Sequence, residues 1–360
     1  MVRLEARQQH SQAMVYLSPV LAIIFTLLSG LVIFSLFGKN PVTALYTFFV
    51  LPISTVYGLT ELLVKAAPLI LIGIGLSIGF RANVWNIGAE GQLTIGAIFG
   101  GGLAIWFYDS ESVFLLPAML IAGIVGGGLY AAVPAFLRTR WGVNEILTSL
   151  MLTYVATLLL SFLVTGPWRD PGGYNFPESR TFPDAGMLPI IMEESRLHFG
   201  AILALLAVIT GWILMARSVV GFQLKVVGLA PAAAKHVGFV QNKLIWISLL
   251  VGGGLAGLAG VGEVAGPIGQ LLPSVSPGYG FTAIIVAFLG RLHPVGVVFA
   301  GLVMALTYIG GETAQIEIGT PAAVTGLFQG ILLFFLLASD VLTTYRVRFG
   351  SPLAERGGSS

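Results

Sequence analysis

The sequence lacks cysteine and has few charged residues. No cysteine occurs among the 360 residues, which excludes disulfide bonds, thiol catalysis and cysteine metal sites. Charged residues make up 9% of the chain, whereas a soluble globular domain carries about 25%. The motifs G-x-x-x-x-G-K-S/T, H-E-x-x-H and G-x-S-x-G are absent too, so no P-loop, zinc-protease or serine-hydrolase site is indicated. We therefore expect no catalytic residue, no metal site and no cofactor bound by this chain.

Apolar residues dominate the composition. They account for 56% of the sequence, and the net charge is only +2. The apolar runs are long and continuous, which is typical of membrane-spanning α-helices; a membrane β-barrel would show alternating strands of about ten residues. The scattered basic residues do not indicate a nucleic-acid-binding surface. The composition predicts an all-α, polytopic membrane protein with a single transmembrane domain over residues 1–360.

Ten apolar segments have the length of a membrane span or approach it. We expect transmembrane helices over 14–37, 58–80, 87–107, 113–137, 145–166, 198–216, 244–266, 278–291, 294–311 and 322–340. Pro41 and Pro52 interrupt the apolar stretch 41–57, which we expect to lie on the outer face without crossing. Two polar excursions remain, an outer loop over 167–197 and a cytoplasmic segment over 217–243.

Basic residues predict the orientation. Arg3 and Arg7 precede the first apolar run, which is longer than a signal-peptide core and has no small-residue cleavage site. With a cytoplasmic N-terminus and ten spans, 13 lysines and arginines face the cytoplasm, four face outward, and Lys65 lies within a span. A shift of one span after Gly166 would move three lysines of the segment 217–243 to the outside. We therefore expect both termini to be cytoplasmic.

Ten spans divide into two sets of five. An odd number of spans per half inverts the second half relative to the first if the two halves are related, as in many transporters. A weak internal similarity favours this plan, because Gly79-Phe80-Arg81 precedes one glycine-rich span and Gly280-Phe281 leads through Arg291 into another. The pattern leaves open both a five-plus-five inverted repeat and two unrelated halves.

A polar stretch, Gly79–Gln92, interrupts the apolar pattern, and we call it the polar segment. Polar groups at membrane depth are costly and usually face a cavity or a partner. Asn83, Asn86, Glu90 and Gln92 are therefore candidates for a solute pathway, with a helix that restarts within the segment. The alternative is a cytoplasmic turn in which Asn83 and Asn86 cap the next helix.

Further carboxylates fall within predicted spans. Glu263 follows a glycine-rich run and either lines the pathway or extends to the outer surface. Glu61 and Lys65 have the spacing of side chains on one helix face, and we expect them to form a structural pair.

Charged residues also mark the predicted cytoplasmic turns. Asn144 is placed to cap a helix that begins at Glu145, whose carboxylate suits a helix amino end. Contact with a cytoplasmic partner is the alternative. Together with Arg81 and Arg291, these residues form a predicted cytoplasmic gate or turn.

The segment 217–243 contains helix signals of its own. Pro231 suits the first turn of a helix, three alanines continue it, and Gly238 suits its carboxyl end. A short helix of small residues has a good shape to enter a groove of a partner protein, and a bare connector is the alternative. The predicted docking residues are Gly228, Ala232, Ala233, Lys235 and Gly238. His236 is expected at the interface and not as a metal ligand, because no second ligand lies at a useful spacing.

The polar segment, G-F-R-A-N-V-W-N-I-G-A-E-G-Q, resembles the signature of permease subunits in the branched-chain amino acid, ribose and nucleoside group of ABC importers. Three later stretches, Val143–Ile146, 228–238 and Ala287–Pro294, resemble further motifs of that family in the same order. Within the group, the chain resembles the larger permease of nucleoside uptake systems, with simple-sugar permeases as the nearest relatives.

The resemblance implies a ten-helix permease in the bacterial plasma (inner) membrane, with the pathway between two permeases and 228–238 as the coupling helix. The implied partners are an ABC ATPase that uses the ATP, a second and related permease, a solute-binding lipoprotein or periplasmic protein, and the lipid membrane. The implied activity is ATP-driven import of nucleosides or related small polar solutes, such as simple sugars, by alternating access. From the pattern alone, an ion-coupled secondary transporter and a non-transporting membrane scaffold stay open.

Overall fold

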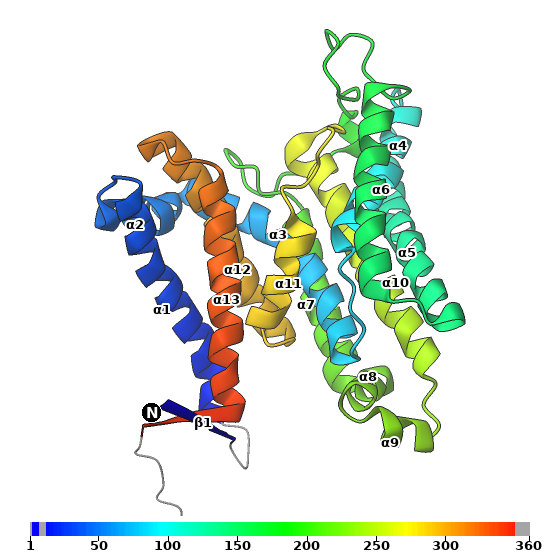
Figure 1. Ribbon diagram of the computed structural model, residues 1–360. Helices are drawn as coiled ribbons and strands as arrows, with labels where there is room; N and C mark the ends of the chain where they lie inside the picture. Colours follow the sequence, from blue (N-terminus) through cyan, green and yellow to red (C-terminus); the bar gives the residue numbers. More distant parts are fainter. Residues whose placement is uncertain (1, 7–11, 350–360) are drawn as a thin grey trace, which may run out of the picture. The chain divides into compact units, whose positions relative to one another are not determined.

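The structure, a computed structural model, describes residues 2–6 and 12–349. Helices dominate it, and it falls into two compact units (Figure 1). One unit contains the residues up to Phe48 and from Gly311 onward, and the other contains Phe49–Gly310. Eight of the described helices are long and apolar enough to cross a membrane, which confirms the prediction of an all-α polytopic membrane protein. Arg7, on which the predicted orientation partly depends, lies outside the described residues.

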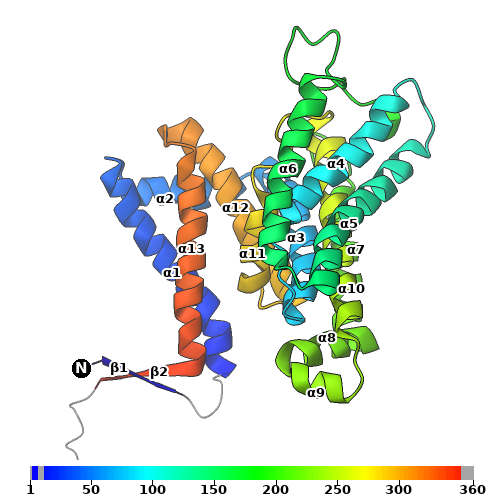
Figure 2. The ribbon, with the colours of Figure 1, turned by 45° about the vertical axis from the view of Figure 1, so that its right-hand side comes forward.

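The first unit is built around two long helices that pack against each other, α1 and α13 (Figure 2). Its elements are β1 (Val2–Ala6), α1 (Gln12–Leu36), α2 (Pro41–Phe49), α13 (Ala323–Thr344) and β2 (Tyr345–Phe349), and it also holds the end of α12. The ring of Phe328 lies 5.6 Å from that of Phe34 and 4.7 Å from that of Phe48. The two short strands pair antiparallel.

The second unit is built around α3 and α10. Its elements are η1 (Leu51–Ile53), α3 (Val56–Arg81), α4 (Ala89–Trp106), α5 (Leu115–Trp141), α6 (Glu145–Thr165), η2 (Asp184–Gly186), α7 (Gly200–Arg217), α8 (Val219–Leu229), α9 (Pro231–His236), α10 (Gln241–Glu263) with the π turn η3 (Val264–Ile268), α11 (Tyr279–Leu289) and most of α12 (Pro294–Ile318). Helix α10 packs against α3, α4 and α5, and α3 also packs against α7 and α11. The most apolar stretch of α3 is 83% buried within the protein, whereas that of α6 is only 22% buried and suits a lipid-facing position.

Glycines allow α10 to approach its neighbours closely. A Cβ at Gly257 would overlap the carbonyl oxygen of Gly123 on α5, and one at Gly96 on α4 would overlap Gly257. Gly75 of α3 faces Gly252 of α10 in the same way, with 2.9 Å between its ideal Cβ and the Cα of Gly252. Small residues at helix contacts are the usual means of close packing between membrane helices. Three neighbouring helices are thus fixed to α10 backbone against backbone.

Helices lie at all ten predicted positions, but two are not long apolar spans. Helix α4 carries Glu90 and Gln92 near its start and is not among the eight apolar spans. Helix α11 has 11 residues, a length of about 16 Å, compared with a hydrocarbon core of about 30 Å. The stretch 41–57 contains the short helices α2 and η1. The inverted repeat stays a prediction.

The two ends of the second unit differ. The loop that follows α6 lies at one end, and α8 and α9 lie at the other (Figures 1 and 2). The carboxyl end of α3 meets α8 at Gly228, and Arg81 bonds to the turn after α11. Trp85, shortly after α3, bonds to Glu145 at the start of α6. The residues predicted to be cytoplasmic in these turns therefore gather at the α8–α9 end, opposite the predicted outer loop.

Candidate functional site

The polar segment begins at a capped helix end. Asn83 has a left-handed backbone with φ of 56°, and the Val84 N–H donates to the Gly79 carbonyl at 3.0 Å. Asparagine tolerates this conformation, and the hydrogen bond closes the last turn of α3. The Asn83 side chain accepts a hydrogen bond from the indole N–H of Trp85 at 2.8 Å. Asn83 therefore ends α3, and the alternative in which it caps the next helix is wrong.

A reciprocal pair of amides fixes the start of α4. The Asn86 side chain donates to Gln92 at 2.8 Å, and Gln92 donates back at 3.0 Å. The Asn86 oxygen also accepts from the Gly88 N–H at 3.1 Å. Both side chains are buried, where an unpaired polar group costs about 1–3 kcal/mol. The two amides thus hold the segment in shape, and contact with a solute stays a prediction.

Glu90 lies at the amino end of α11. Its carboxylate accepts a hydrogen bond from the Gly280 N–H at 2.6 Å. Ser276 lies beside the carboxylate, and its hydroxyl oxygen accepts hydrogen bonds from the Gly278 and Tyr279 N–H groups. A carboxylate suits a helix amino end, where backbone N–H groups have no partner within the helix. A Cβ at Gly280 would overlap the backbone nitrogen of Glu90, so the contact requires glycine. Glu90 therefore links α4 to the short helix α11.

Two charged residues connect the polar segment to neighbouring turns. Arg81 donates through Nε to the carbonyl oxygen of Leu292, in the turn after α11, at 2.9 Å. Glu145 accepts from the backbone N–H of Trp85 at 3.3 Å and forms an ion pair with Arg138. Of the predicted gate residues, Arg81 thus belongs to the polar segment, and Glu145 bonds to it.

The other two predicted turn residues shape the turns themselves. Asn144 caps α6 as predicted, because its side chain accepts from the N–H groups of Ile146 and Leu147 at 2.8 and 3.4 Å. Arg291 has a left-handed backbone with φ of 56° between α11 and α12. Both lie at the α8–α9 end of the unit, and a gating role for them stays a prediction.

Three aromatic rings pack beside Arg81. Phe80 stacks on Phe288 with 5.2 Å between ring centroids and 18° between planes. Trp85 lies 5.0 Å from Phe80 and 5.7 Å from Phe288. The rings come from α3, the polar segment and α11, and so join these elements. Sequence reasoning missed this cluster, for which the only signal was the similarity between Gly79-Phe80-Arg81 and the region from Gly280 to Arg291.

Helix α9 has the predicted helix signals. Pro231 occupies its first turn, and Gly238 has a left-handed φ of 82° just beyond its end. The N–H groups of Gly238 and Phe239 donate to the carbonyls of Lys235 and Ala234 at 3.1 and 3.0 Å, which are the two bonds of a Schellman cap. The prediction of a short capped helix is confirmed.

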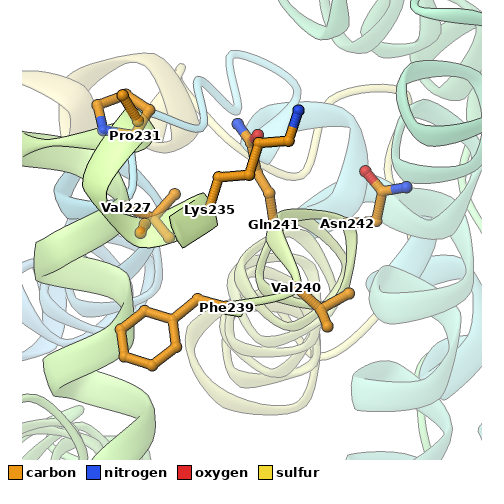
Figure 3. Close-up of a pocket in the computed structure, with 9 residues that line it drawn as sticks. Val227, Pro231, Lys235, Phe239, Val240, Gln241 and Asn242 are labelled. Atoms are coloured by element: carbon orange, nitrogen blue, oxygen red, sulfur yellow. The ribbon is translucent and has the colours of Figure 1, made fainter. Parts of the chain in front are cut away.

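One side of α9 is exposed. Ala232, Ala233 and Lys235 are exposed, whereas Ala234 is buried. Beside the helix is a hollow of about 500 Å³. Figure 3 shows the residues around it, among them Val227 of α8, Pro231 and Lys235 of α9, Phe239 and Val240 before α10, and Gln241 and Asn242 of α10. The helix thus presents small side chains and one cation beside a cavity.

Gly228 faces the interior and not this open surface. A Cβ at Gly228 would overlap the carbonyl oxygen of Arg81 and lie 3.3 Å from the Cα of Ala82. Helix α8 therefore touches the first residues after α3 through bare backbone. The structure brings together the polar segment and the segment that leads into α9.

A charged cluster lies among α3, α10 and the predicted outer loop. Glu61 pairs with Arg196 of the loop through two hydrogen bonds, and the expected pair of Glu61 with Lys65 stays a prediction. Glu263 is buried at 6% exposure and interacts electrostatically with Lys65 and Arg196. Glu263 therefore does not extend to the outer surface. The pKa of Arg196 is raised, chiefly by its hydrogen bond to Glu61.

His198 is buried beside this cluster. Its Nδ1 accepts a hydrogen bond from the Gly200 N–H at 3.1 Å, so the neutral ring carries its proton on Nε2. That nitrogen lies against Gly266 of η3. Burial lowers the pKa of His198 to about 4, against a small opposing effect of Glu61.

Acidification should destabilise the protein through His198. The pKa of about 4 in the folded protein lies below the ordinary value of about 6.5, so the unfolded chain takes up the proton first as the pH falls. The stabilisation is complete above about pH 6.5, is lost toward pH 4, and amounts to at most about 3 kcal/mol. We expect the unfolding temperature, followed by tryptophan fluorescence in detergent, to fall more steeply over this range for the wild type than for His198→Gln. Parallel curves would contradict this assignment.

Residues 58–337 match the family model described as the permease component of the branched-chain amino acid transport system. The chain belongs to this family. A glucose ABC transporter permease of Haloferax volcanii is 38% identical to it, over 96% of this chain and 93% of the relative. A guanosine ABC transporter permease of Bacillus subtilis is 31% identical, over 92% and 94%. A nucleoside ABC transporter permease of Lactococcus lactis is 27% identical, over 91% and 92%.

Family membership decides which class of membrane protein this is, a question that the sequence pattern alone left open. The chain is a multi-pass permease subunit of an ABC importer in the plasma membrane, and it is a transport subunit and not an enzyme. An ATPase in a separate subunit is its partner. An ion-coupled secondary transporter is not favoured.

Proposed function

We propose that this permease subunit imports nucleosides or related small polar solutes, such as simple sugars, and that the ATPase docks on α9. The observation that carries the docking proposal is the exposed, capped helix of small residues at the end of the unit opposite the long loop (Figure 1). The solute class is supported by the relatives, which are named for glucose, guanosine and nucleosides. These solutes share a sugar ring with several hydroxyl groups.

Apolar side chains around α9 support docking of a partner protein. Leu229, Val237 and Val240 flank the helix and are 76%, 70% and 63% exposed. Apolar residues that gather on an exposed surface mark an interaction site more often than a free surface. Lys235 adds positive charge at the carboxyl end of α9, so an acidic groove would complement it.

In the proposed transport cycle, binding of the ATPase to α9 is coupled to the state of the solute pathway. The permease changes state only as far as its partners bind its two states differently. A solute-binding lipoprotein or periplasmic protein would deliver the solute at the end that carries the loop 167–197, and a second permease, related but different, would complete the pathway. In this proposal Asn86, Glu90, Gln92 and Glu263 line or support the pathway, and Asn83 ends α3 at its inner mouth.

Uptake assays test the proposal. Cells that express the chain with its neighbouring ATPase, second permease and solute-binding protein are given labelled guanosine or labelled glucose, with unlabelled competitors. We expect saturable uptake of a nucleoside or a simple sugar that disappears when the ATPase is deleted. Uptake of neither solute class would reject the proposed solutes, and uptake without the ATPase would reject the proposed energy source.

A further inference from the structure

The polar segment holds the amino end of α11. Glu90 accepts from the Gly280 N–H at 2.6 Å, and Gly280 is so close to the first turn of α4 that any side chain would overlap it. Ser276, whose hydroxyl oxygen accepts hydrogen bonds from the Gly278 and Tyr279 N–H groups, lies beside the carboxylate. The Glu90 carboxylate thus binds the first turn of this helix.

The polar segment also holds the carboxyl end of the same helix. Phe288 stacks on Phe80 and Trp85, and the Arg81 side chain donates to the Leu292 carbonyl at 2.9 Å. Helix α11 has 11 residues, about 16 Å, so the two attachments lie at its opposite ends. A helix held at both ends by one stretch of chain does not shift independently of that stretch.

Helix α8, which leads into α9, contacts the polar segment at Arg81. Gly228, in the last turn of α8, meets the Arg81 carbonyl with no side chain between the two backbones. Only Ala230 separates α8 from α9. Arg81 is at once the residue that Gly228 touches and the one that bonds to the turn after α11.

We infer that Gly228, Arg81 and Glu90 are positioning residues that make α8, the polar segment and α11 move as one body during transport. This inference depends on the proposed docking of the ATPase on α9. A displacement of α9 passes through the Gly228–Arg81 contact to the polar segment, and through Glu90 and the three rings to α11. The contacts consist of backbone, buried hydrogen bonds and packed rings, which are costly to break away from water and so transmit movement between rigid elements.

A tether tests whether the polar segment and α11 move together. The chain has no cysteine, so Trp85→Cys with Phe288→Cys gives it a single thiol pair, and the partner subunits are used in cysteine-free form. The double variant keeps the bonds of Glu90 and Arg81 at the two ends of α11. The complete importer carrying both substitutions is assayed for uptake of labelled guanosine and labelled glucose before and after linking with a short bifunctional thiol reagent. We expect linking to leave the uptake of the double variant unchanged. Loss of uptake on linking, with the ATPase still bound, would overturn the inference.

A second experiment tests the contact at Gly228. Phe281→Cys, at a position 41% exposed on α11, reports movement through its rate of thiol labelling in the complete importer with and without ATP. We expect the ATP-dependent change in rate to fall about tenfold in Gly228→Leu, a size typical of coupling between sites. Gly262→Ala is the matched control, because nothing lies within 4 Å of a Cβ there.

The outcomes separate this inference from the proposed function. If the ATPase co-purifies with Gly228→Leu and the ATP-dependent change in labelling is intact, the inference is wrong. If the ATPase does not co-purify with the otherwise wild-type chain, the proposed docking fails. Should Gly228→Leu not accumulate in the membrane, Gly228→Ala is measured in the same way, and the tether experiment decides independently.

Discussion

Replacing Ala233 by tryptophan should abolish solute uptake by keeping the ATPase from binding. Ala233 is exposed on α9 beside Ala232, and in the proposed docking its small side chain would let a groove of the ATPase close around the helix. A large ring would hold the two proteins apart, and disruption of a central interface contact costs about 2 kcal/mol or more, about thirtyfold in affinity. We expect the ATPase to be lost from the affinity-purified variant and uptake to fall to the level of cells without the ATPase.

Ala233→Ser is the matched control, because it keeps the side chain small at the same position. Both variants should reach the membrane in equal amounts, since the residue is exposed and lies in the first turn of a helix. Quantitative blotting of membranes and of the purified complex measures both quantities. Wild-type recovery of the ATPase with Ala233→Trp would contradict docking on α9.

The second large effect is expected at Gly257 in the middle of α10. A Cβ there would overlap the carbonyl oxygen of Gly123 and lie 3.0 Å from the Cα of Gly127, while Gly96 of α4 approaches Gly257 from another side. Gly257→Val therefore forces α5 away from α10. Overpacking of a tight contact costs about 1–3 kcal/mol and occasionally more, and here the obstructing atoms are backbone atoms of α5. We expect low yield and a clearly lower unfolding temperature in detergent.

The control for this prediction lies on the same helix. Gly262 has nothing within 4 Å of an added Cβ, so Gly262→Ala should unfold at the wild-type temperature. Thermal unfolding of both variants, followed by tryptophan fluorescence, compares a tight glycine with an open one. Equal unfolding temperatures for Gly257→Val and Gly262→Ala would show that the close approach is not needed for stability.

Local signals in the sequence predicted much of the fold. Asn144 caps α6, and Pro231 and Gly238 bound α9, because these residues act on the backbone within a few positions of themselves. The polar segment was also evident, since charged and amide groups stand out in an apolar chain. Such signals predict where helices begin and end, and they need no knowledge of the partners across the fold.

The partners of the site residues were beyond prediction from the pattern. Glu90 bonds to Gly280, and Arg81 touches Gly228 and bonds to Leu292, all far away in the sequence. Spacing along one helix predicted a Glu61–Lys65 pair, but nothing in the sequence indicated that Arg196 would reach Glu61. Residue spacing in a single sequence does not predict contacts of this kind, because they depend on how whole helices pack against each other.

The length of α11 was also not predictable from the sequence pattern. The apolar run 278–291 predicted a span, yet the helix covers only Tyr279–Leu289. Hydropathy reports whether a segment tolerates the membrane interior, and a short helix buried among others has the same composition as part of a span. Its attachment to the polar segment at both ends became visible only in the folded structure.

ATP-driven uptake by the purified importer tests the central claim most directly. The chain is reconstituted in liposomes with its ATPase and second permease, with ATP enclosed and with the solute-binding protein and labelled guanosine or glucose outside. We predict uptake that requires the enclosed ATP and that stops when the ATPase is catalytically inactive or when this chain carries Ala233→Trp. Uptake driven by a proton or sodium gradient in the absence of ATP would contradict the account.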